Sequence, residues 1–182
     1  MHNLEELELF ERIKETASRD YLTNIYNRRY FFETGEVMHA HAVKQQSPLA
    51  LAILDIDDLK LINDDFGHRA GDQVLIFLTE ELSQSFPHFL VARTGGEQFG
   101  ILMPNLNNEQ AVTLLDGFRA IIASMTIDIN DCSEPQSISI SAGVSNRIGD
   151  SIDELLHEAD QLLSRAKEAG KNMVIGDDEE TL

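Results

Sequence analysis

The chain has 182 residues, of which 42% are hydrophobic and 25% charged, a balance typical of a globular protein with a substantial core. Its formal net charge is −18, and such an acidic surface argues against binding DNA or RNA through a broad basic face. No apolar run approaches the roughly 20 residues of a membrane span, and the acidic N-terminus does not resemble a signal peptide. The single cysteine, Cys132, cannot form an internal disulfide. We therefore expect a cytoplasmic protein.

Residues 1–19 are expected to form a helical linker. Apolar side chains recur there at three- and four-residue steps, and the other positions are mostly charged. Two arrangements fit this pattern: an exposed helix that forms a short coiled-coil stalk, or a helix that packs on its own domain. The residues of the stripe are Leu4, Leu7, Phe10, Ile13 and Ala17.

A second helix is predicted between residues 29 and 46, after a polar turn that contains several arginines. Phe32, Val37 and Val43 are the candidates for its buried side. Ser47-Pro48 then ends the helix, because proline disfavours helical geometry at the residue before it.

Residues 49–54 form a continuous apolar run, as expected of a central strand that is buried on both faces. The run ends in Asp55-Ile56-Asp57-Asp58, and a strand end is a place where a rigid element delivers functional groups to solvent. A short helix is predicted over residues 59–65 and a loop over residues 67–71. Asp72 then stands near the start of a helix, where it could serve as a cap.

Two short apolar strands, residues 89–92 and 99–103, flank Gly95-Gly96 and predict a β-hairpin. Glycine-rich hairpin turns usually need backbone with positive φ, which glycine adopts without steric cost. The turn presents Glu97 at the tip of the hairpin. Such a carboxylate could bind a cation or could be an ordinary solvated turn residue.

The C-terminal half predicts an amphipathic helix over residues 107–125, a half-buried strand over 138–144 and a helix over 151–169. Ser151 is the expected N-cap of the last helix, and an edge strand follows at residues 173–175. Few strands alternate with helices, and two strands form a hairpin. This pattern favours an α+β fold, in which a mainly antiparallel sheet carries helices.

If the strands that end at Asp55 and Glu97 are neighbours, their carboxylates converge on one point. Mg²⁺ is commonly held by one or two carboxylates together with substrate phosphates, so this pair is suited to a nucleotide site. Lys167 and Lys171 lie four residues apart near a helix end, where they could meet a polyphosphate. They could equally complement the negative end of the helix dipole.

The order of these motifs resembles the GGDEF family, the diguanylate cyclases of bacterial signalling, between Asp20 and Ile175. The resemblance implies a fold like the palm of nucleotidyl cyclases and polymerases. It also implies a GGDEF domain over residues 20–175, preceded by the helical linker and followed by an acidic, disordered tail at 176–182. The motifs that carry the resemblance span residues 20–31, 54–64, 66–72, 93–99, 139–144 and 159–172.

By this resemblance, Asp55, the backbone carbonyl of Ile56 and Glu97 hold Mg²⁺ or Mn²⁺, with two ions in each active site. Asn63 and Asp72 bond the guanine edge of GTP. The remaining GTP contacts are the backbone N–H groups of Asp58, Leu59 and Lys60 and the side chains of Lys167 and Lys171.

The resemblance implies that two such domains face each other, each holding one GTP, and close cyclic di-GMP with release of pyrophosphate. Turnover then needs a homodimer, and an upstream sensor usually controls it. Gln98 departs from the Glu of the family signature and Lys171 from the usual Arg. Phe86 and Phe89 stand where an Arg-x-x-Asp product-inhibition site is expected, so that site is absent. The alternative hypothesis is a catalytically degenerate domain that binds GTP or a protein as a regulatory module.

Overall fold

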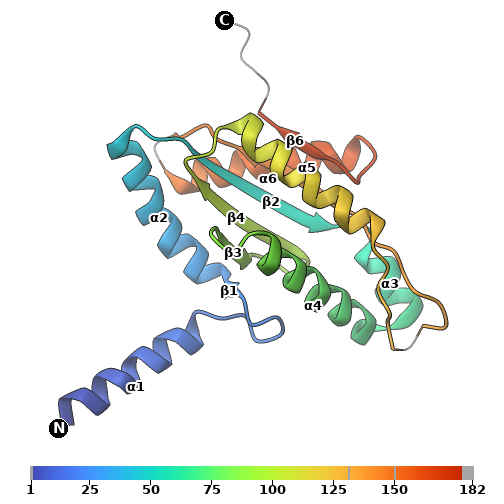
Figure 1. Ribbon diagram of the computed structural model, residues 1–182, viewed down its shortest axis with the longest axis horizontal. Coiled ribbons are helices and arrows are strands. Elements are labelled where there is room, and N and C mark those ends of the chain that lie inside the picture. The colour runs from blue at the N-terminus through green and yellow to red at the C-terminus, as the bar shows by residue number, and fades with distance from the viewer. Residues whose placement is uncertain (1, 131, 150, 178–182) are drawn as a thin grey trace, which may run out of the picture.

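The computed structural model describes residues 2–130, 132–149 and 151–177, with only the backbone described for residues 2–5 and Phe10 (Figure 1). No helix within these ranges is long and apolar enough to cross a bilayer. The elements in chain order are α1 (His2–Ala17), β1 (Tyr26–Asn27), α2 (Arg28–Gln45), β2 (Leu49–Ile56), α3 (Leu59–Phe66), α4 (His68–Ser85), β3 (Leu90–Arg93), β4 (Gln98–Pro104), α5 (Asn108–Ser124), β5 (Ile140–Ser145), α6 (Ile152–Glu168) and β6 (Val174–Gly176).

Within the described residues, six strands form one sheet in the order β1-β3-β4-β2-β5-β6. The central neighbours β3–β4, β4–β2 and β2–β5 are antiparallel, whereas the outer pairs β1–β3 and β5–β6 are parallel. Helices surround this mixed sheet (Figure 1). The predicted α+β fold with a mainly antiparallel sheet is confirmed, and β6 lies at the expected edge.

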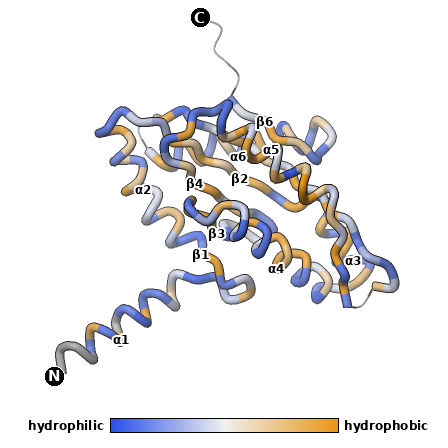
Figure 2. The backbone as a smooth tube through the Cα atoms, in the orientation of Figure 1, coloured by the Kyte–Doolittle hydropathy of each residue, from blue (hydrophilic) through white to orange (hydrophobic). Residues whose placement is uncertain are grey.

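The central strand β2 is buried along its whole length, as its apolar run predicts. Its alternating side chains enter two different cores, because a strand points successive residues to opposite faces. Leu51 and Ile53 pack with residues of α2 and α6, whereas Ala52 and Leu54 pack with residues of α4 and α5. Figure 2 shows the hydrophobic character of β2 against the largely hydrophilic α1.

The buried side of α2 differs from the prediction. Val37 and Val43 are 69% and 51% exposed, and Phe32 is only partly buried. The helix instead buries a face that carries Gly35 and His39. A Cβ at Gly35 would lie 3.1 Å from Leu102 Cδ1, so the face with the smallest residue approaches the sheet most closely. The prediction therefore named the wrong face of α2 as buried.

Two other local predictions are corrected. The strand predicted as half-buried, β5, is buried at every position because α5 and α6 cover its two faces. The predicted loop at residues 67–71 is reduced to Gly67, whose φ of 88° turns the chain directly from α3 into α4. Asp72 consequently lies inside α4 and does not cap it.

The N-terminal helix is confirmed as α1, which extends away from the sheet (Figure 1). Leu7 and Ile13 are 56% and 58% exposed, which argues against packing on the domain. Leu4 and Phe10 of the predicted stripe lie outside the residues whose side chains are described. Of the predicted acidic tail, residues 178–182 also lie outside the described ranges, whereas Asp177 accepts a hydrogen bond from the backbone N–H of Asn146 at 2.8 Å.

A pair of glycines gives a test of the packing between β5 and α6. Added to Gly143, a Cβ would overlap backbone atoms of Ala159 and Leu163, which cannot move without separating the two elements. We expect Gly143→Ala to lower the free energy of unfolding by about 3 kcal/mol or more. Gly117→Ala is the control, because Gly117 is exposed in α5 with nothing within 4 Å of an added Cβ. It should raise stability by about 0.5–1 kcal/mol, measured by urea unfolding. Equal effects of the two substitutions would contradict this account.

Candidate nucleotide and metal site

The predicted hairpin forms from β3 and β4, with Arg93 paired to Phe99 at its closed end. Gly95 and Gly96 do not adopt the left-handed region that was expected of them. A side chain at Gly95 would instead crowd Gln98, since a Cβ there would lie 3.2 Å from Cβ of Gln98. The turn closes where the backbone N–H groups of Thr94 and Gly95 both donate to the carbonyl of Gln98, at 2.9 and 3.2 Å.

Arg93 ties this turn to the chain that precedes β1. Its guanidinium donates to the carbonyl of Gly96 at 2.6 and 3.0 Å and pairs with Asp20 at 3.1 Å. Asp20 also accepts from the backbone N–H and the hydroxyl of Thr23, at 2.9 and 2.7 Å. Burial pushes the pKa of Asp20 upward, but the bonds from Thr23 and Arg93 outweigh it and hold the pKa below its usual value.

Of the two carboxylates predicted to converge, Asp55 lies on β2 and Glu97 lies in the turn immediately before β4, the neighbouring strand. Asp55 is directly opposite Gln98 in their antiparallel register, and the backbone N–H of Ile56 donates to the carbonyl of Glu97 at 3.4 Å. Asp55 is 6% exposed. Burial raises the pKa of Asp55 to about 6, an ion pair with Lys167 opposes that rise, and the charge of Glu97 adds to it.

The oxygens at this point fit a hard divalent cation. Oδ2 of Asp55 pairs with Lys167, while Oδ1 is buried and has no hydrogen-bond partner within the described residues. An unpaired buried carboxylate oxygen is costly, and a cation would satisfy it. Asp55, Glu97 and the carbonyl of Ile56 offer only oxygen donors, which suit Mg²⁺ or Mn²⁺. The described residues hold no cluster of three His, Cys, Asp or Glu side chains suited to a metal, so substrate phosphates would have to complete this shell.

Asp57, in contrast, is fully engaged in structural bonds. It accepts from the hydroxyls of Ser139 and Ser141, each at 2.7 Å, and from the backbone N–H of Asn172 at 2.9 Å. Lys171 and Asn172 have φ of 65° and 47°, a conformation unfavourable for residues other than glycine. Asp57 therefore fixes a strained turn, a role that the sequence pattern did not predict for it.

The strained turn delivers Lys171 to the N-terminus of α3, where its ammonium lies 2.5 Å from Asp58 Oδ1. The side chain of Asp58 makes no capping bond to α3, and its own φ is 56°. The first amides of a helix have no acceptor within the helix, so those of Leu59 and Lys60 are suited to bind phosphate. Lys167 and Lys171 thus lie at the strand end and at this helix start, and their contact with a polyphosphate stays a prediction.

The two residues predicted to contact guanine, Asn63 and Asp72, do not line the same cavity. Oδ1 of Asn63 is buried without a hydrogen-bond partner in the described part of the chain, and Gly71 lies directly against it. Asp72 is exposed and lines a cavity of about 260 Å³ with Leu22 and other residues, but Asn63 is not among them. The unpaired amide oxygen of Asn63 is suited to accept a hydrogen bond from a ligand. A shared role of Asn63 and Asp72 in binding guanine remains a prediction.

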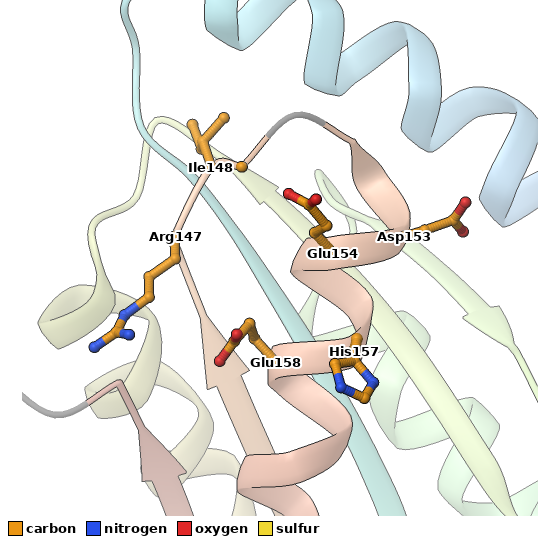
Figure 3. Close-up of a pocket in the computed structure, with 7 residues that line it drawn as sticks. Arg147, Ile148, Asp153, Glu154, His157 and Glu158 are labelled. Atoms are coloured by element: carbon orange, nitrogen blue, oxygen red, sulfur yellow. The ribbon is translucent and has the colours of Figure 1, made fainter.

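A larger cavity of about 560 Å³ lies elsewhere, between the chain after β5 and the first turns of α6 (Figure 3). Its lining includes Arg147 and His157 but also three carboxylates, those of Asp153, Glu154 and Glu158. It lies roughly ten residues along α6 from Lys167, which corresponds to about 15 Å. Its acidic lining makes it a poor site for a nucleotide polyphosphate.

Comparison with known proteins decides the family. Residues 17–173 match the family described as "Diguanylate cyclase, GGDEF domain". This chain belongs to the GGDEF family. It is 39% identical over 165 residues to the probable diguanylate cyclase DgcT of Escherichia coli, covering 89% of this chain and 36% of that protein. It is 40% identical over 161 residues to the diguanylate cyclase DgcP of Pseudomonas aeruginosa, covering 87% of this chain and 24% of that protein. The chain thus spans well under half the length of these two curated relatives.

Solved structures of GGDEF domains agree with the fold. The coiled coil and GGDEF domain of DgcB from Caulobacter crescentus, in complex with c-di-GMP, gives a TM-score of 0.90 at 29% identity over 97% of this chain and 94% of that one. The active GGEEF domain of a diguanylate cyclase from Vibrio cholerae gives 0.77 at 32% identity over 85% and 98%. The palm-like fold is therefore confirmed.

The positions expected to form a product-inhibition site in this GGDEF domain carry aromatic rings. Phe86 is 3% exposed, and its ring centroid lies 5.1 Å from that of Phe118 and 6.3 Å from that of Phe89. These rings make hydrophobic contacts and supply neither the charge nor the hydrogen bonds of an Arg-x-x-Asp pair.

The bonds of Asp57 predict a local defect on its substitution. In Asp57→Ala the backbone N–H of Asn172 loses its acceptor, and two hydroxyls lose theirs. We expect a loss of about 2–4 kcal/mol in unfolding free energy and faster hydrogen exchange at the Asn172 amide. Asp58→Ala is the control, since its ion pair is exposed and worth at most about 1 kcal/mol. Unchanged exchange at Asn172 in Asp57→Ala would contradict the assignment.

The tie between Asp20 and Arg93 predicts a pH dependence. Because the folded pKa of Asp20 is below its usual value of 3.8, its carboxylate stabilises the fold above that value. This contribution is lost as pH falls through the lower, folded pKa. The stability difference between the wild type and Asp20→Asn should therefore be largest near neutral pH and shrink below about pH 4, measured by urea unfolding. Asp128→Asn, at an exposed position, controls for loss of one charge. A difference independent of pH would refute the role of the ionised group.

Proposed function

We propose that this GGDEF domain condenses two molecules of GTP into cyclic di-GMP and releases pyrophosphate. The observation that carries the proposal is the buried, unpaired oxygen of Asp55 beside Glu97, at a strand end next to the start of α3. The family relationship supports the same reaction, since its named members include diguanylate cyclases.

In this proposal, Asp55, Glu97 and the carbonyl of Ile56 hold Mg²⁺ or Mn²⁺, two ions in each site. The metal would stabilise negative charge on the attacking and leaving oxygens of the transferred phosphate. Lys167, which pairs with Asp55, would be available to the substrate phosphates, since a cation would supply the positive charge beside Asp55. Lys171, held by the turn that Asp57 fixes, is available to a second phosphate.

The remaining groups would orient GTP. The first amides of α3, including those of Leu59 and Lys60, would bind the phosphates without needing a particular side chain. The buried amide oxygen of Asn63 would accept a bond from the guanine edge, and Asp72 would accept another. Such acceptors match the N1–H and amino donors of guanine, which adenine does not present together on one edge.

Each domain would hold one GTP, so two copies must face each other for the 3′-hydroxyl of one to attack the α-phosphate of the other. The exposed apolar residues Leu7, Leu9 and Ile13 on α1 support pairing of two copies through a stalk. We also propose that an upstream sensor sets this pairing. The curated relatives are longer than this chain, which leaves room in them for such a domain.

One observation favours the second candidate, a degenerate domain that binds GTP as a regulatory module. Gln98 carries no charge and bonds to Asp160 of α6 at 3.2 Å, so it offers the metal site no carboxylate. That candidate and the cyclase share GTP binding and differ only in turnover.

The test of turnover uses the protein fused to a dimerising coiled coil, with GTP and either Mg²⁺ or Mn²⁺. We expect cyclic di-GMP and pyrophosphate by chromatography. Glu97→Gln should lower the rate at least about 100-fold, because it removes a charge from the metal site. Glu109→Gln, an exposed substitution on α5, is the matched control and should retain the wild-type rate.

Equilibrium binding of GTP by calorimetry separates the two candidate functions. Binding of GTP without any product would favour the regulatory module. Full turnover by Glu97→Gln would disprove the assignment of Glu97 to the metal.

A further inference from the structure

The residue that departs from the family signature, Gln98, has two specific partners. Its amide oxygen accepts from the hydroxyl of Thr94 at 3.3 Å, and its amide nitrogen donates to Oδ1 of Asp160 at 3.2 Å. Thr94 is itself 3% exposed. Thus both hydrogen-bonding ends of the Gln98 side chain are used.

These contacts link the hairpin to the helix that also contacts Asp55. Gln98 lies directly opposite Asp55 in the register of β4 and β2, so the two side chains leave the same face of the sheet. Asp160 and Lys167 lie seven residues apart on α6, about two turns, and hence on one side of that helix. Asp160 meets Gln98, and Lys167 meets Asp55. Helix α6 therefore contacts both β2 and β4, through Asp55 and Gln98.

We propose that Gln98 is a positioning residue: its bond to Asp160 fixes the hairpin tip against α6 and thereby sets Glu97 beside Asp55. The bond itself is present in the structure. Its effect on turnover rests on the proposed function.

The identity of the side chain matters because Asp160, when ionised, only accepts hydrogen bonds. A glutamine can donate to it, whereas a glutamate would set two carboxylates against each other. Burial already raises the pKa of Asp160 above its usual value, with the bond from Gln98 opposing that rise. Removal of the bond from Gln98 would leave the partly buried carboxylate of Asp160 with fewer groups that stabilise its charge.

A positioning role for Gln98 and an effect of charge alone predict opposite changes in activity for Gln98→Glu. If Gln98 matters only because the metal site lacks a carboxylate, the substitution should raise the activity. If the bond to Asp160 positions the hairpin, the substitution should lower it, and a partner change on α6 should compensate.

The experiment compares Gln98→Glu, Asp160→Ala, which removes the acceptor, and the double variant Gln98→Glu/Asp160→Asn in the dimerised protein. Each single substitution should reduce kcat about two- to tenfold, the worth of one net hydrogen bond, and raise the Mg²⁺ concentration needed for half-maximal rate. In the double variant the new amide on α6 would donate to the new carboxylate on β4, which restores the bond with its direction reversed. We expect kcat and the Mg²⁺ requirement of the double variant to return most of the way to wild type.

Urea unfolding in metal-free buffer tests the bond without reference to catalysis. Both single variants should unfold at lower urea than wild type, and the double variant should recover. If no variant makes cyclic di-GMP but this recovery holds, the proposed function fails and the positioning bond stands. A higher kcat for Gln98→Glu alone, or a double variant no better than the worse single one in unfolding, would overturn the inference.

Discussion

The antiparallel register between β2 and β4 is the constraint on which the site depends. It sets Asp55 opposite Gln98 and lets the backbone of Ile56 bond to the backbone of Glu97. A shift of one residue would turn Asp55 to the other face of the sheet, away from α6. The apolar residues of both strands oppose such a shift, because each face enters a different core. Hydrophobic packing thus fixes the position of the two carboxylates.

The second feature is the concentration of charge at this strand end. Asp55, Asp57 and Asp58 follow one another within four residues, yet each has a different partner: a lysine on α6, two serines with a backbone amide, and an exposed lysine. Their different environments give them different roles. The one left with an unpaired oxygen is the one suited to bind a cation, and the one with every oxygen bonded supports the loop that carries Lys171.

Local patterns predicted most elements but not which of their faces are buried. The continuous run of β2 and the capped start of α6 behaved as expected. The prediction of the buried side of α2 was wrong because Gly35 permits a close approach of α2 to the sheet, which hydrophobicity does not indicate. Similarly, the serines of β5 suggested a solvent-facing side, yet Ser141 is buried and donates to Asp57. A polar residue with a specific partner is indistinguishable from an exposed one in sequence.

By itself, the sequence determined most of the helices and strands, the hairpin, and the acidic and basic residues available for a nucleotide site, because these follow from periodicity, turn chemistry and motif order. It did not predict the two-residue strand β1. Only the tertiary structure decided what each residue contacts. It gave Asp57 its bonds to two serines and a backbone amide, and it joined Gln98 to Asp160 across 62 positions of the chain. Such contacts depend on how strands and helices pack, and local sequence patterns carry no information about them.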